Sequence, residues 1–357
     1  MPLFRHQTLR QLGYAIFETL GCRPPDARIV ADHLVDSSLF GHDSHGMLRF
    51  YEYVDNVRAG QFDPTGEPKL VMDKPCTAVV DGGGAMGQVG AVFATKIAIA
   101  KARVHGLAAV TLKNTGHVGR VGAYPLMAAR QGLMGLAIVN AGHLGHQIAP
   151  FGGIDGKLST NPIAFAAPRR GADPIMVDMA TSMVSEGKIR ALQNRGQRLP
   201  DGWIIDHDGQ PTTEEGKYLN DPRGAILPLG GASAHKGYCL SMMVELMGGA
   251  LSGEGCAAGK TPMSSNGMIM QAYQIEHFTD LDDYYDQVES LARHVMTSRI
   301  DPDIGQIQLP GEPEFRAAAK HKKQGIPVDE TTWTRICLAA RTLKLDPAGW
   351  QREAIEV

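Results

Sequence analysis

Apolar residues near the start of the chain recur every three or four positions, which is the period of a helix with one buried face. In the first helix that we predict, these residues are Leu9, Leu12, Ile16 and Leu20. Asp26 follows two prolines and is a suitable cap for a second helix, which we expect to end at Gly41. A third helix is predicted from residue 43 or 44 to Gly60.

The pattern then changes, and short β-rich runs alternate with helical runs. We expect strands over residues 77–81, 107–113, 133–140, 163–167, 175–178, 203–206 and 268–273. Helices are predicted over residues 88–105, 124–131 and 236–251. This alternation predicts an α/β core with a largely buried sheet.

About the last 75 residues are again helical in pattern, with a loop at 308–312. We therefore divide the chain into a mainly helical region, residues 1–75 plus 280–357, and an α/β region, residues 76–279, that binds cofactor and substrate. The two helical ends are expected to pack together, so that the α/β region is an insertion between them.

Net charge, apolar runs and cysteine spacing indicate which kinds of binding partner the protein can have. The net charge of −3 gives no electrostatic field that would attract nucleic acid or an anionic membrane. The sequence has neither a secretory signal pattern at its start nor an apolar run of the roughly 20 residues that a membrane span needs. The five cysteines are scattered without a CxxC pair, which predicts reduced thiols in the cytoplasm and argues against structural zinc. We expect a small-molecule ligand.

The glycine-rich run from Gly82 to Gly87 matches the GxGxxG pattern of Rossmann dinucleotide sites, since it lies between a predicted strand and a predicted helix. Such a site also needs a carboxylate about 20 residues later, at the end of the next strand, to bind the ribose hydroxyls. Here that strand ends in Lys113 and Asn114. We therefore predict a glycine-rich turn and not a Rossmann site.

Residues 41–49 combine groups that suit an anionic substrate. If Asp43 or Ser44 caps the third helix, His45 lies in its first turn and Arg49 follows on the same face. The helix start and the Arg49 guanidinium both favour a carboxylate. The same field disfavours a charged imidazole, so that His45 can accept a proton. The alternative is that Ser44 is only a cap and His45 a surface residue.

A second histidine, His117, lies in the glycine-rich segment 114–124, directly after a predicted strand. Ligand crevices of α/β sheets open at the C-terminal ends of strands, and glycines let the backbone approach a ligand closely. His117 is therefore a candidate substrate contact. The alternative is a flexible loop with an incidental histidine.

Three further segments, 159–162, 178–182 and 235–238, are short polar loops or helix starts. The first two suit hydrogen bonds to ribose and phosphate, and Lys236 stands where a phosphate would meet a helix dipole and a cation. Each segment alone is more typical of a cap or a turn. His143 and His146 have no nearby carboxylate or cysteine ligand, so we predict no metal site.

Taken in order, these segments resemble the type-2 malate/L-lactate dehydrogenase family over nearly the whole chain. The matching segments are residues 43–49, 114–120, 159–163, 178–182, 235–238 and 309–312. One such motif is weak, but six in the same order are specific. Near the C-terminus, segment 325–329 followed by Trp333 looks most similar to the bacterial hydroxycarboxylate dehydrogenases of that family.

The resemblance implies a homodimeric oxidoreductase that transfers a hydride between NAD(P)H and a small 2-oxo/2-hydroxy carboxylate, with a nicotinamide-binding fold that is not Rossmann. It implies that His45 is the acid/base and that Arg49 and Ser44 bind the substrate. It also implies that His117 is a second catalytic histidine in contact with the substrate, which some members of the family use as the proton acceptor, so the sequence leaves open which of the two histidines transfers the proton. Cofactor contacts would map to Thr160, Asn161, Asp178, Met179, Ala180, Thr181, Ser182, His235, Lys236, Gly237, Gly311 and Glu312. NAD is the expected cofactor, with NADP left open.

The chain departs from the family pattern at Thr115-Gly116, Ser159 and Cys239, which affects the substrate pocket and the cofactor loops rather than the fold. The sequence does not choose among malate, lactate and related acids, and only the closest resemblance suggests a broad or aromatic 2-hydroxy acid. Two other enzymes stay open: a reductase of cyclic 2-imino acids that uses the same site, and a metal-dependent lyase or hydrolase built on the four histidines named above. A non-catalytic binding protein is least favoured.

Overall fold

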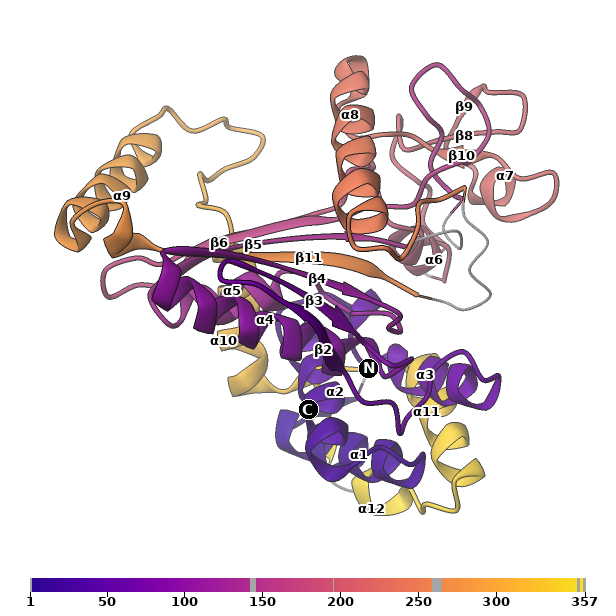
Figure 1. Cartoon of the computed structure of the whole chain (residues 1–357). Helices are drawn as coiled ribbons and strands as arrows, with labels where there is room; N and C mark the ends of the chain where they lie inside the picture. Colours follow the sequence, from indigo (N-terminus) through magenta and orange to yellow (C-terminus); the bar gives the residue numbers. More distant parts are fainter. Residues whose placement is uncertain (1, 142–145, 195, 259–264, 352–353, 356–357) are drawn as a thin grey trace.

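A computed structural model describes residues 2–141, 146–194, 196–258, 265–351 and 354–355. Its centre is a seven-stranded sheet (Figure 1). The strand order is β2 (Lys69–Asp73), β3 (Thr77–Asp81), β4 (Leu107–Lys113), β11 (Gly267–Gln274), β5 (Leu133–Asn140), β6 (Ile163–Ala167) and β7 (Ile175–Met179). Of the pairings between these described strands, only β3–β4 is parallel and the other five are antiparallel. The predicted α/β architecture is confirmed, with a mixed sheet.

Helices cover both faces of this sheet. α4 (Gly87–His105) and α5 (Ala123–Ala129) share a core with strand residues such as Val139 and Met270. α8 (His235–Val244) continues into a π-helical turn (Glu245–Ala250) and packs against Ile138 and Ile269. Since neighbouring residues of a strand point to opposite faces, α8 lies on the face opposite α4. The helix expected over 236–251 therefore changes type at Glu245.

The N-terminal and C-terminal helices share another core. They are α1 (His6–Thr19), α2 (Pro24–Leu39), α3 (Arg49–Arg58), α10 (Glu312–Gln324), α11 (Glu330–Thr342) and α12 (Ala348–Gln351). The rings of Phe4 and Trp333 lie with their centroids 4.2 Å apart. A small sheet joins β12 (Ile326–Pro327), β1 (Leu3–Phe4) and β13 (Ala354–Ile355). α9 (Leu281–Met296) lies apart from these helices, where Glu289 pairs with Arg169 at 2.8 Å (Figure 1).

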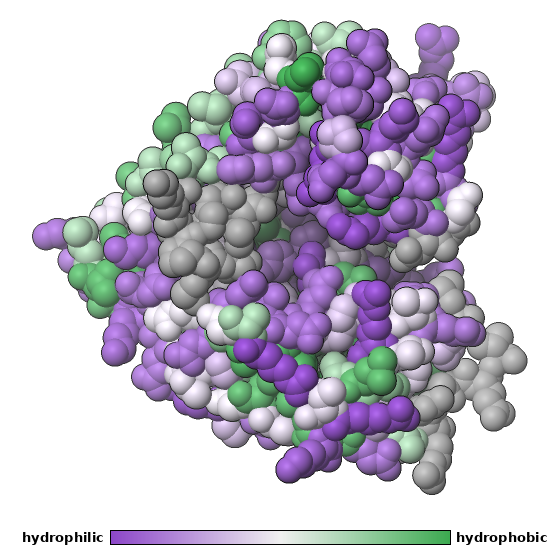
Figure 2. All heavy atoms as spheres, turned by 90° about the vertical axis from the view of Figure 1, so that its right-hand side faces the viewer, coloured by the Kyte–Doolittle hydropathy of each residue, from purple (hydrophilic) through white to green (hydrophobic). Residues whose placement is uncertain are grey.

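A small lobe is inserted after β7. It contains α6 (Glu186–Asn194), α7 (Glu215–Leu219) and a sheet of β10 (Ala225–Ile226), β8 (Ile204–Ile205) and β9 (Pro211–Thr212). Its core includes Ile189, Ile204, Tyr218 and Ile226. Figure 2 shows the molecule hollowed between its upper and lower parts on this side, with many hydrophilic side chains along the hollow. Within the described ranges, no helix has both the length and the apolar character that crossing a bilayer requires.

Two helix starts differ from the sequence prediction. Arg23 is the N-cap of α2, and Asp26 lies inside the helix and binds the Arg23 guanidinium at 2.6 Å. Asp43–His45 form a 3₁₀ turn and α3 begins only at Arg49, so the continuous helix predicted from residue 43 is wrong. Gly46 interrupts the helix, because its backbone is not helical (φ −108°, ψ −130°), and it lies so close to α2 that a Cβ there would stand 2.1 Å from Oγ of Ser38.

Candidate active site

His45 and His117 lie together although they belong to distant parts of the sequence. Their imidazole rings are nearly parallel, with centroids 5.5 Å apart and an interplanar angle of 28°. His45 ends the 3₁₀ turn, and its Nδ1 lies 2.9 Å from the Ser44 hydroxyl. His117 belongs to the loop that follows β4, at the C-terminal strand end where a ligand crevice was expected. The structure thus brings the two predicted histidines into one site.

Tyr53, which the sequence analysis did not single out, orients His117. Its hydroxyl lies 2.7 Å from Nδ1 of His117 and accepts a hydrogen bond from Nε2 of Gln88 at 2.8 Å. Gln88 supplies a donor to this oxygen, so the tyrosine proton is left for His117, either at Nδ1 or at the carbonyl oxygen 3.4 Å away. A proton directed to Nδ1 leaves Nε2 as the N–H of the ring. Tyr53 lies one helical turn after Arg49, and this spacing was the available sequence signal.

Arg49 is tied back to the turn that carries His45. Its Nε donates to the Ser44 carbonyl at 2.8 Å, and a terminal nitrogen pairs with Glu52 at 2.5 Å. The Arg49 side chain is 27% exposed, so that part of the guanidinium remains accessible. The prediction that His45 and Arg49 share one helix face is wrong, because Gly46 ends the 3₁₀ turn. They are neighbours through a hydrogen bond to the backbone of Ser44 instead.

Both imidazoles of the pair are held neutral. Burial, followed by the neighbouring Arg49 cation, lowers the pKa of His45 to about 3. The same two causes lower the pKa of His117 well below its usual value. Loss of water and a nearby cation both disfavour a second positive charge. Near neutral pH both rings are therefore uncharged, so that each has one nitrogen with a free lone pair and one that carries an N–H.

Loops from three parts of the sequence, residues 159–161, 178–183 and 227–237, are hydrogen-bonded into one unit that we call the loop cluster. The Thr160 carbonyl accepts from the Thr181 N–H at 2.9 Å and from its hydroxyl at 3.1 Å. The Thr181 carbonyl accepts from Leu229, and the Leu229 carbonyl accepts from Gly237 at 3.2 Å. A Cβ at Gly237 would stand 2.3 Å from that carbonyl, so the contact needs glycine. Candidate cofactor residues from all three segments are therefore brought together.

Other candidates of the loop cluster differ in exposure. Met179 is exposed at the end of β7, and His235 and Lys236 are exposed at the start of α8. Ser182 is buried, and its hydroxyl donates to the Val184 carbonyl at 2.9 Å. The Ser182 hydroxyl is thus already used within the protein, whereas Lys236 is accessible to a phosphate.

Asp178 stands at the end of β7 with one carboxylate oxygen held. Oδ2 accepts from the N–H of Gly122 at 2.9 Å and lies 3.6 Å from the buried Arg120 guanidinium, which stacks over the Phe40 ring at 4.6 Å. A Cβ at Gly122 would stand 2.5 Å from this oxygen, which explains the glycine. No hydrogen bond from the described residues engages Oδ1, which leaves it for a ligand.

Gly311 and Glu312 reach the same strand from the C-terminal part of the chain. The Met176 N–H donates to the Pro310 carbonyl at 3.0 Å. Gly311 has φ +95°, a conformation that favours glycine, and a Cβ there would stand 2.9 Å from Cβ of Met176. The Glu312 carboxylate accepts from the Leu309 N–H at 3.1 Å and closes its own turn. Both candidates therefore lie beside β7.

The glycine run 82–87 packs against the loop of His117. The N–H groups of Gly82 and Gly84 donate to the carbonyls of Lys113 and Asn114, each at 2.8 Å. A Cβ at Gly87 would stand 2.2 Å from the Gly116 carbonyl oxygen. These glycines are explained by contact between two backbone segments.

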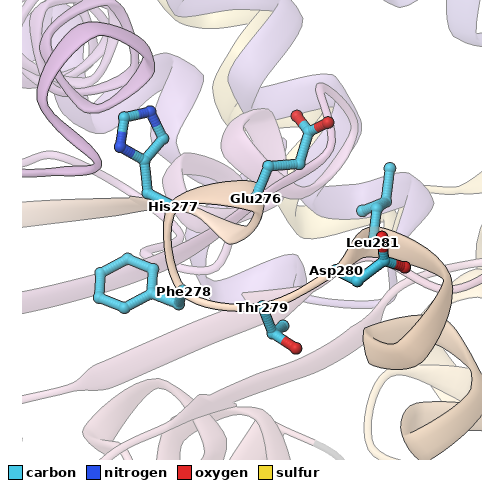
Figure 3. A pocket seen from close by; sticks show the side chains of 6 residues that line it. All are labelled: Glu276, His277, Phe278, Thr279, Asp280 and Leu281. Carbon is cyan, nitrogen blue, oxygen red and sulfur yellow. The ribbon is translucent and has the colours of Figure 1, made fainter.

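Three other features were considered as sites, within the described part of the chain. The depression in Figure 3 is lined by residues 276–281, just beyond the C-terminal end of β11, whereas the His117 loop lies at the start of that strand. His143 lies outside the described residues, and His146 Nε2 lies 2.8 Å from the Ala257 carbonyl. The described residues contain no group of three side chains that could hold a metal ion.

The chain is similar in sequence to known dehydrogenases. Malate dehydrogenase of Pyrococcus abyssi is 37% identical over 321 residues, 88% of this chain and 87% of that protein. Hydroxycarboxylate dehydrogenase B of Escherichia coli K12 is 36% identical over 344 residues, 95% of this chain and 94% of that protein.

The fold is also similar to solved structures of related enzymes. Malate dehydrogenase from Entamoeba histolytica superposes with a TM-score of 0.90 at 28% identity, over 96% of this chain and 98% of that one. Δ1-piperideine-2-carboxylate reductase from Pseudomonas syringae pv. tomato superposes with a TM-score of 0.83 at 28% identity, over 95% and 100%. A family profile described as malate/L-lactate dehydrogenase matches residues 4–337. The resemblance read from six sequence segments is thereby confirmed, and the chain belongs to the malate/L-lactate dehydrogenase family.

Proposed function

We propose that the protein is a nicotinamide-dependent dehydrogenase that interconverts a small 2-hydroxy carboxylate and the corresponding 2-oxo carboxylate. The observation that carries this proposal is the contact of two neutral histidines, His45 and His117, beside the partly exposed Arg49. A carboxylate on Arg49 presents the adjacent carbon and its oxygen to the histidines. The malate and hydroxycarboxylate dehydrogenases among the relatives are oxidoreductases of this substrate class.

Each residue has a distinct role in this proposal. Arg49 holds the substrate carboxylate with the part of its guanidinium that Ser44 and Glu52 leave accessible. His45, neutral at rest, accepts the hydroxyl proton when a 2-hydroxy acid is oxidised and returns it in the reverse direction. His117 supports the same oxygen with its Nε2–H. Ser44, whose hydroxyl contacts His45, is also a substrate contact. Nicotinamide, when bound, supplies or accepts the hydride.

We place the dinucleotide along the loop cluster and the end of β7, with Gly311 and Glu312 at its edge. The residues fit such a group, because Asp178 offers a carboxylate oxygen to ribose hydroxyls and Lys236 is exposed at a helix start. The nicotinamide-binding fold is not Rossmann in this proposal. In support, a Rossmann sheet is mostly parallel, whereas this sheet is mostly antiparallel, and backbone contacts occupy the glycine run.

NAD is the cofactor that we favour, with NADP as the alternative. A carboxylate that binds ribose hydroxyls repels the additional 2′-phosphate of NADP, and Asp178 is fixed in position by Gly122. Titration of the protein with NADH and NADPH decides between them.

The domain division, the dimer and the compartment are part of the same proposal. We divide the chain into residues 1–75 plus 280–357 and residues 76–279. A homodimer is supported by large apolar side chains that are exposed on β2 and on the π-helical turn, including Val71, Met72 and Leu246. All five cysteines are free thiols, which suits the cytoplasm.

A second candidate function is reduction of a cyclic 2-imino acid at the same site. It is favoured by the structural similarity to Δ1-piperideine-2-carboxylate reductase. One assay tests both functions: loss of absorbance at about 340 nm from NADH or NADPH, against 2-oxo acids and cyclic imines. Oxidation of neither cofactor by any of these substrates contradicts the proposal, and activity that a chelator abolishes supports the metal-dependent alternative instead.

A further inference from the structure

Glu245 is a buried carboxylate surrounded by N–H donors. It begins the π-helical turn and is 3% exposed. Its Oε1 accepts from Nδ2 of Asn161 at 2.8 Å, while Oε2 accepts from Nδ2 of Asn140 at 3.2 Å and from the Ala257 N–H at 2.9 Å. Burying a carboxylate costs free energy that neutral donors only partly offset, and π-helical turns are frequent at functional sites. A functional reason for Glu245 is therefore expected.

Glu245 fixes the orientation of the Asn161 amide. Both Nδ2 hydrogens have acceptors, because the second one is directed to Oγ of Ser241 at 2.9 Å. A carboxylate can only accept, so turning the amide over would place its oxygen against Oε1 of Glu245. The Asn161 Oδ1 consequently points away from the carboxylate.

Among the described residues the Asn161 Oδ1 has no hydrogen-bond partner, although Asn161 is fully buried. Its backbone φ of +41° is uncommon for a residue other than glycine. Buried polar atoms are nearly always paired, and an exception in a candidate cofactor loop points to a donor on the ligand.

The same carboxylate is linked to the loop of His117. Asn140 donates to Glu245, and its carbonyl accepts from Nδ2 of Asn266 at 2.9 Å. The Asn266 Oδ1 accepts from the N–H of Val118, which directly follows His117, at 2.9 Å. Buried hydrogen bonds thus connect Asn161 with the catalytic loop. The reacting ring of the cofactor has to lie beside that loop, and its N–H donor is the carboxamide.

We propose that Glu245 is a positioning residue that holds the Asn161 Oδ1 ready to accept a hydrogen bond from the nicotinamide carboxamide. The inference rests on the proposed function, because it takes a nicotinamide dinucleotide as the ligand. It adds a residue that acts on the cofactor through another side chain.

The test compares NADH with reduced 3-acetylpyridine adenine dinucleotide, in which a methyl ketone replaces the carboxamide and removes its N–H donor. Dissociation constants come from calorimetric titration without substrate. The wild-type protein is expected to bind NADH about tenfold more tightly than the analogue. In Glu245→Gln an amide N–H must face one of the existing donors, so Asn161 loses its fixed orientation and the preference falls to about twofold.

A second pair of variants separates positioning from general damage. Asn161→Asp alone places two carboxylates in contact and also loses the preference. The double variant that combines Asn161→Asp with Glu245→Gln recovers most of the preference for NADH. In it, the amide introduced at position 245 donates to the carboxylate introduced at position 161, whose other oxygen still accepts from the ligand. Glu289→Gln, on α9, is the matched control and keeps the tenfold preference, since that carboxylate pairs with Arg169. Melting temperatures of all variants report folding.

Each contrary outcome is informative. If the wild-type protein binds both dinucleotides equally, or if Glu245→Gln keeps the wild-type preference, the inference is wrong while the proposed function stands. If Glu245→Gln fails to fold, Asn161→Leu removes the acceptor directly and must lose the preference. Should Asn161→Leu instead discriminate less against nicotinamide hypoxanthine dinucleotide, which lacks the adenine amino group, Asn161 contacts the adenine and the inference is overturned. If neither NADH nor NADPH binds the wild-type protein, the proposed function itself fails.

Discussion

The Tyr53 hydroxyl lies 2.7 Å from Nδ1 of His117, and this contact distinguishes the two histidines of the site. Gln88 donates to Tyr53, and we expect the tyrosine in turn to donate to Nδ1 of His117, which leaves Nε2–H as the donor of that ring. His45 instead lies against the Ser44 hydroxyl and beside Arg49. The two rings, a hydrogen-bond donor and a proton acceptor in our proposal, lie with their centroids 5.5 Å apart.

Tyr53→Phe removes the group that selects the His117 tautomer. We expect kcat to fall about 10- to 100-fold, because a hydrogen bond to the reacting oxygen is lost in part of the molecules. The dissociation constant of the reduced cofactor should hardly change. Tyr51→Phe is the control, since that hydroxyl lies on the same helix but accepts from Arg335 at 3.2 Å. Equal kcat values for the two variants would show that Tyr53 does not orient His117 for catalysis.

Arg49→Lys keeps the charge but loses the planar guanidinium that suits a carboxylate. The KM of the 2-oxo acid should rise about 10- to 100-fold, the worth of a charge-assisted hydrogen bond. Binding of reduced cofactor, measured by titration, should stay nearly constant. Arg58→Lys, at the exposed end of the same helix, serves as the control. If Arg49→Lys weakens cofactor binding as much as it raises the KM of the 2-oxo acid, Arg49 binds the cofactor and not the substrate.

His33 makes the fold sensitive to acid. It is buried, accepts the Arg120 N–H at 2.9 Å, and has its pKa lowered from 6.5 to about 3 by burial and by Arg120. Below pH 6.5 the unfolded chain binds a proton that the folded protein refuses, so stability is complete above this pH and declines as pH falls toward 3. From pH 7 to 5, His33 should account for a loss of about 2 kcal/mol.

Urea unfolding at both pH values measures this contribution. His33→Gln keeps an acceptor for the Arg120 N–H without titrating, so its loss between pH 7 and 5 should be about 2 kcal/mol smaller than that of the wild-type protein. Identical losses would show that His33 is not responsible.

Gly87→Ala tests whether the glycine run supports the His117 loop. A Cβ at Gly87 would stand 2.2 Å from the Gly116 carbonyl oxygen and 2.3 Å from the His117 carbonyl, so that loop must move. We expect kcat to fall about 100-fold, since misplacing catalytic groups by about 1 Å has such an effect. Gly132→Ala, at a positive φ with open space around it, should only lower stability by about 1 kcal/mol. Loss of cofactor binding with unchanged kcat would instead place the cofactor on this run.

The sequence pattern was sufficient to predict those strands in which buried and exposed residues alternate or in which the apolar run is continuous. The strands expected over 107–113 and 133–140 have the bounds of β4 and β5, because their inward residues are buried between two helical layers. β2 was not predicted, since all of its residues are exposed and no burial pattern marks it. The break at Gly46 depends on contact with Ser38 of another helix, which no local spacing reveals.

In the candidate site, too, some features could be predicted from the sequence and others could not. His45, Arg49 and His117 were recognisable singly, because they lie in short polar segments at turns and strand ends. Their mutual placement depends on the tertiary packing of α2, α3 and the loop after β4. Glu245 was read as part of an ordinary apolar helix, and its link to Asn161 joins residues 84 positions apart. Such buried polar contacts leave no periodic trace in a sequence.

We propose that His45 exchanges the proton with the substrate oxygen while His117 supports that oxygen. A bound substrate carboxylate neutralises Arg49 and so removes one cause of the depressed pKa of His45, which brings its ionisation toward the range of a kinetic pH profile. The decisive measurement is kcat against pH at saturating cofactor for His45→Ala and His117→Ala. We predict that His45→Ala lowers kcat by about 10²–10⁴-fold and abolishes the ionisation, whereas His117→Ala slows turnover and retains it. An ionisation that survives in His45→Ala and vanishes in His117→Ala would contradict the account and exchange the two roles.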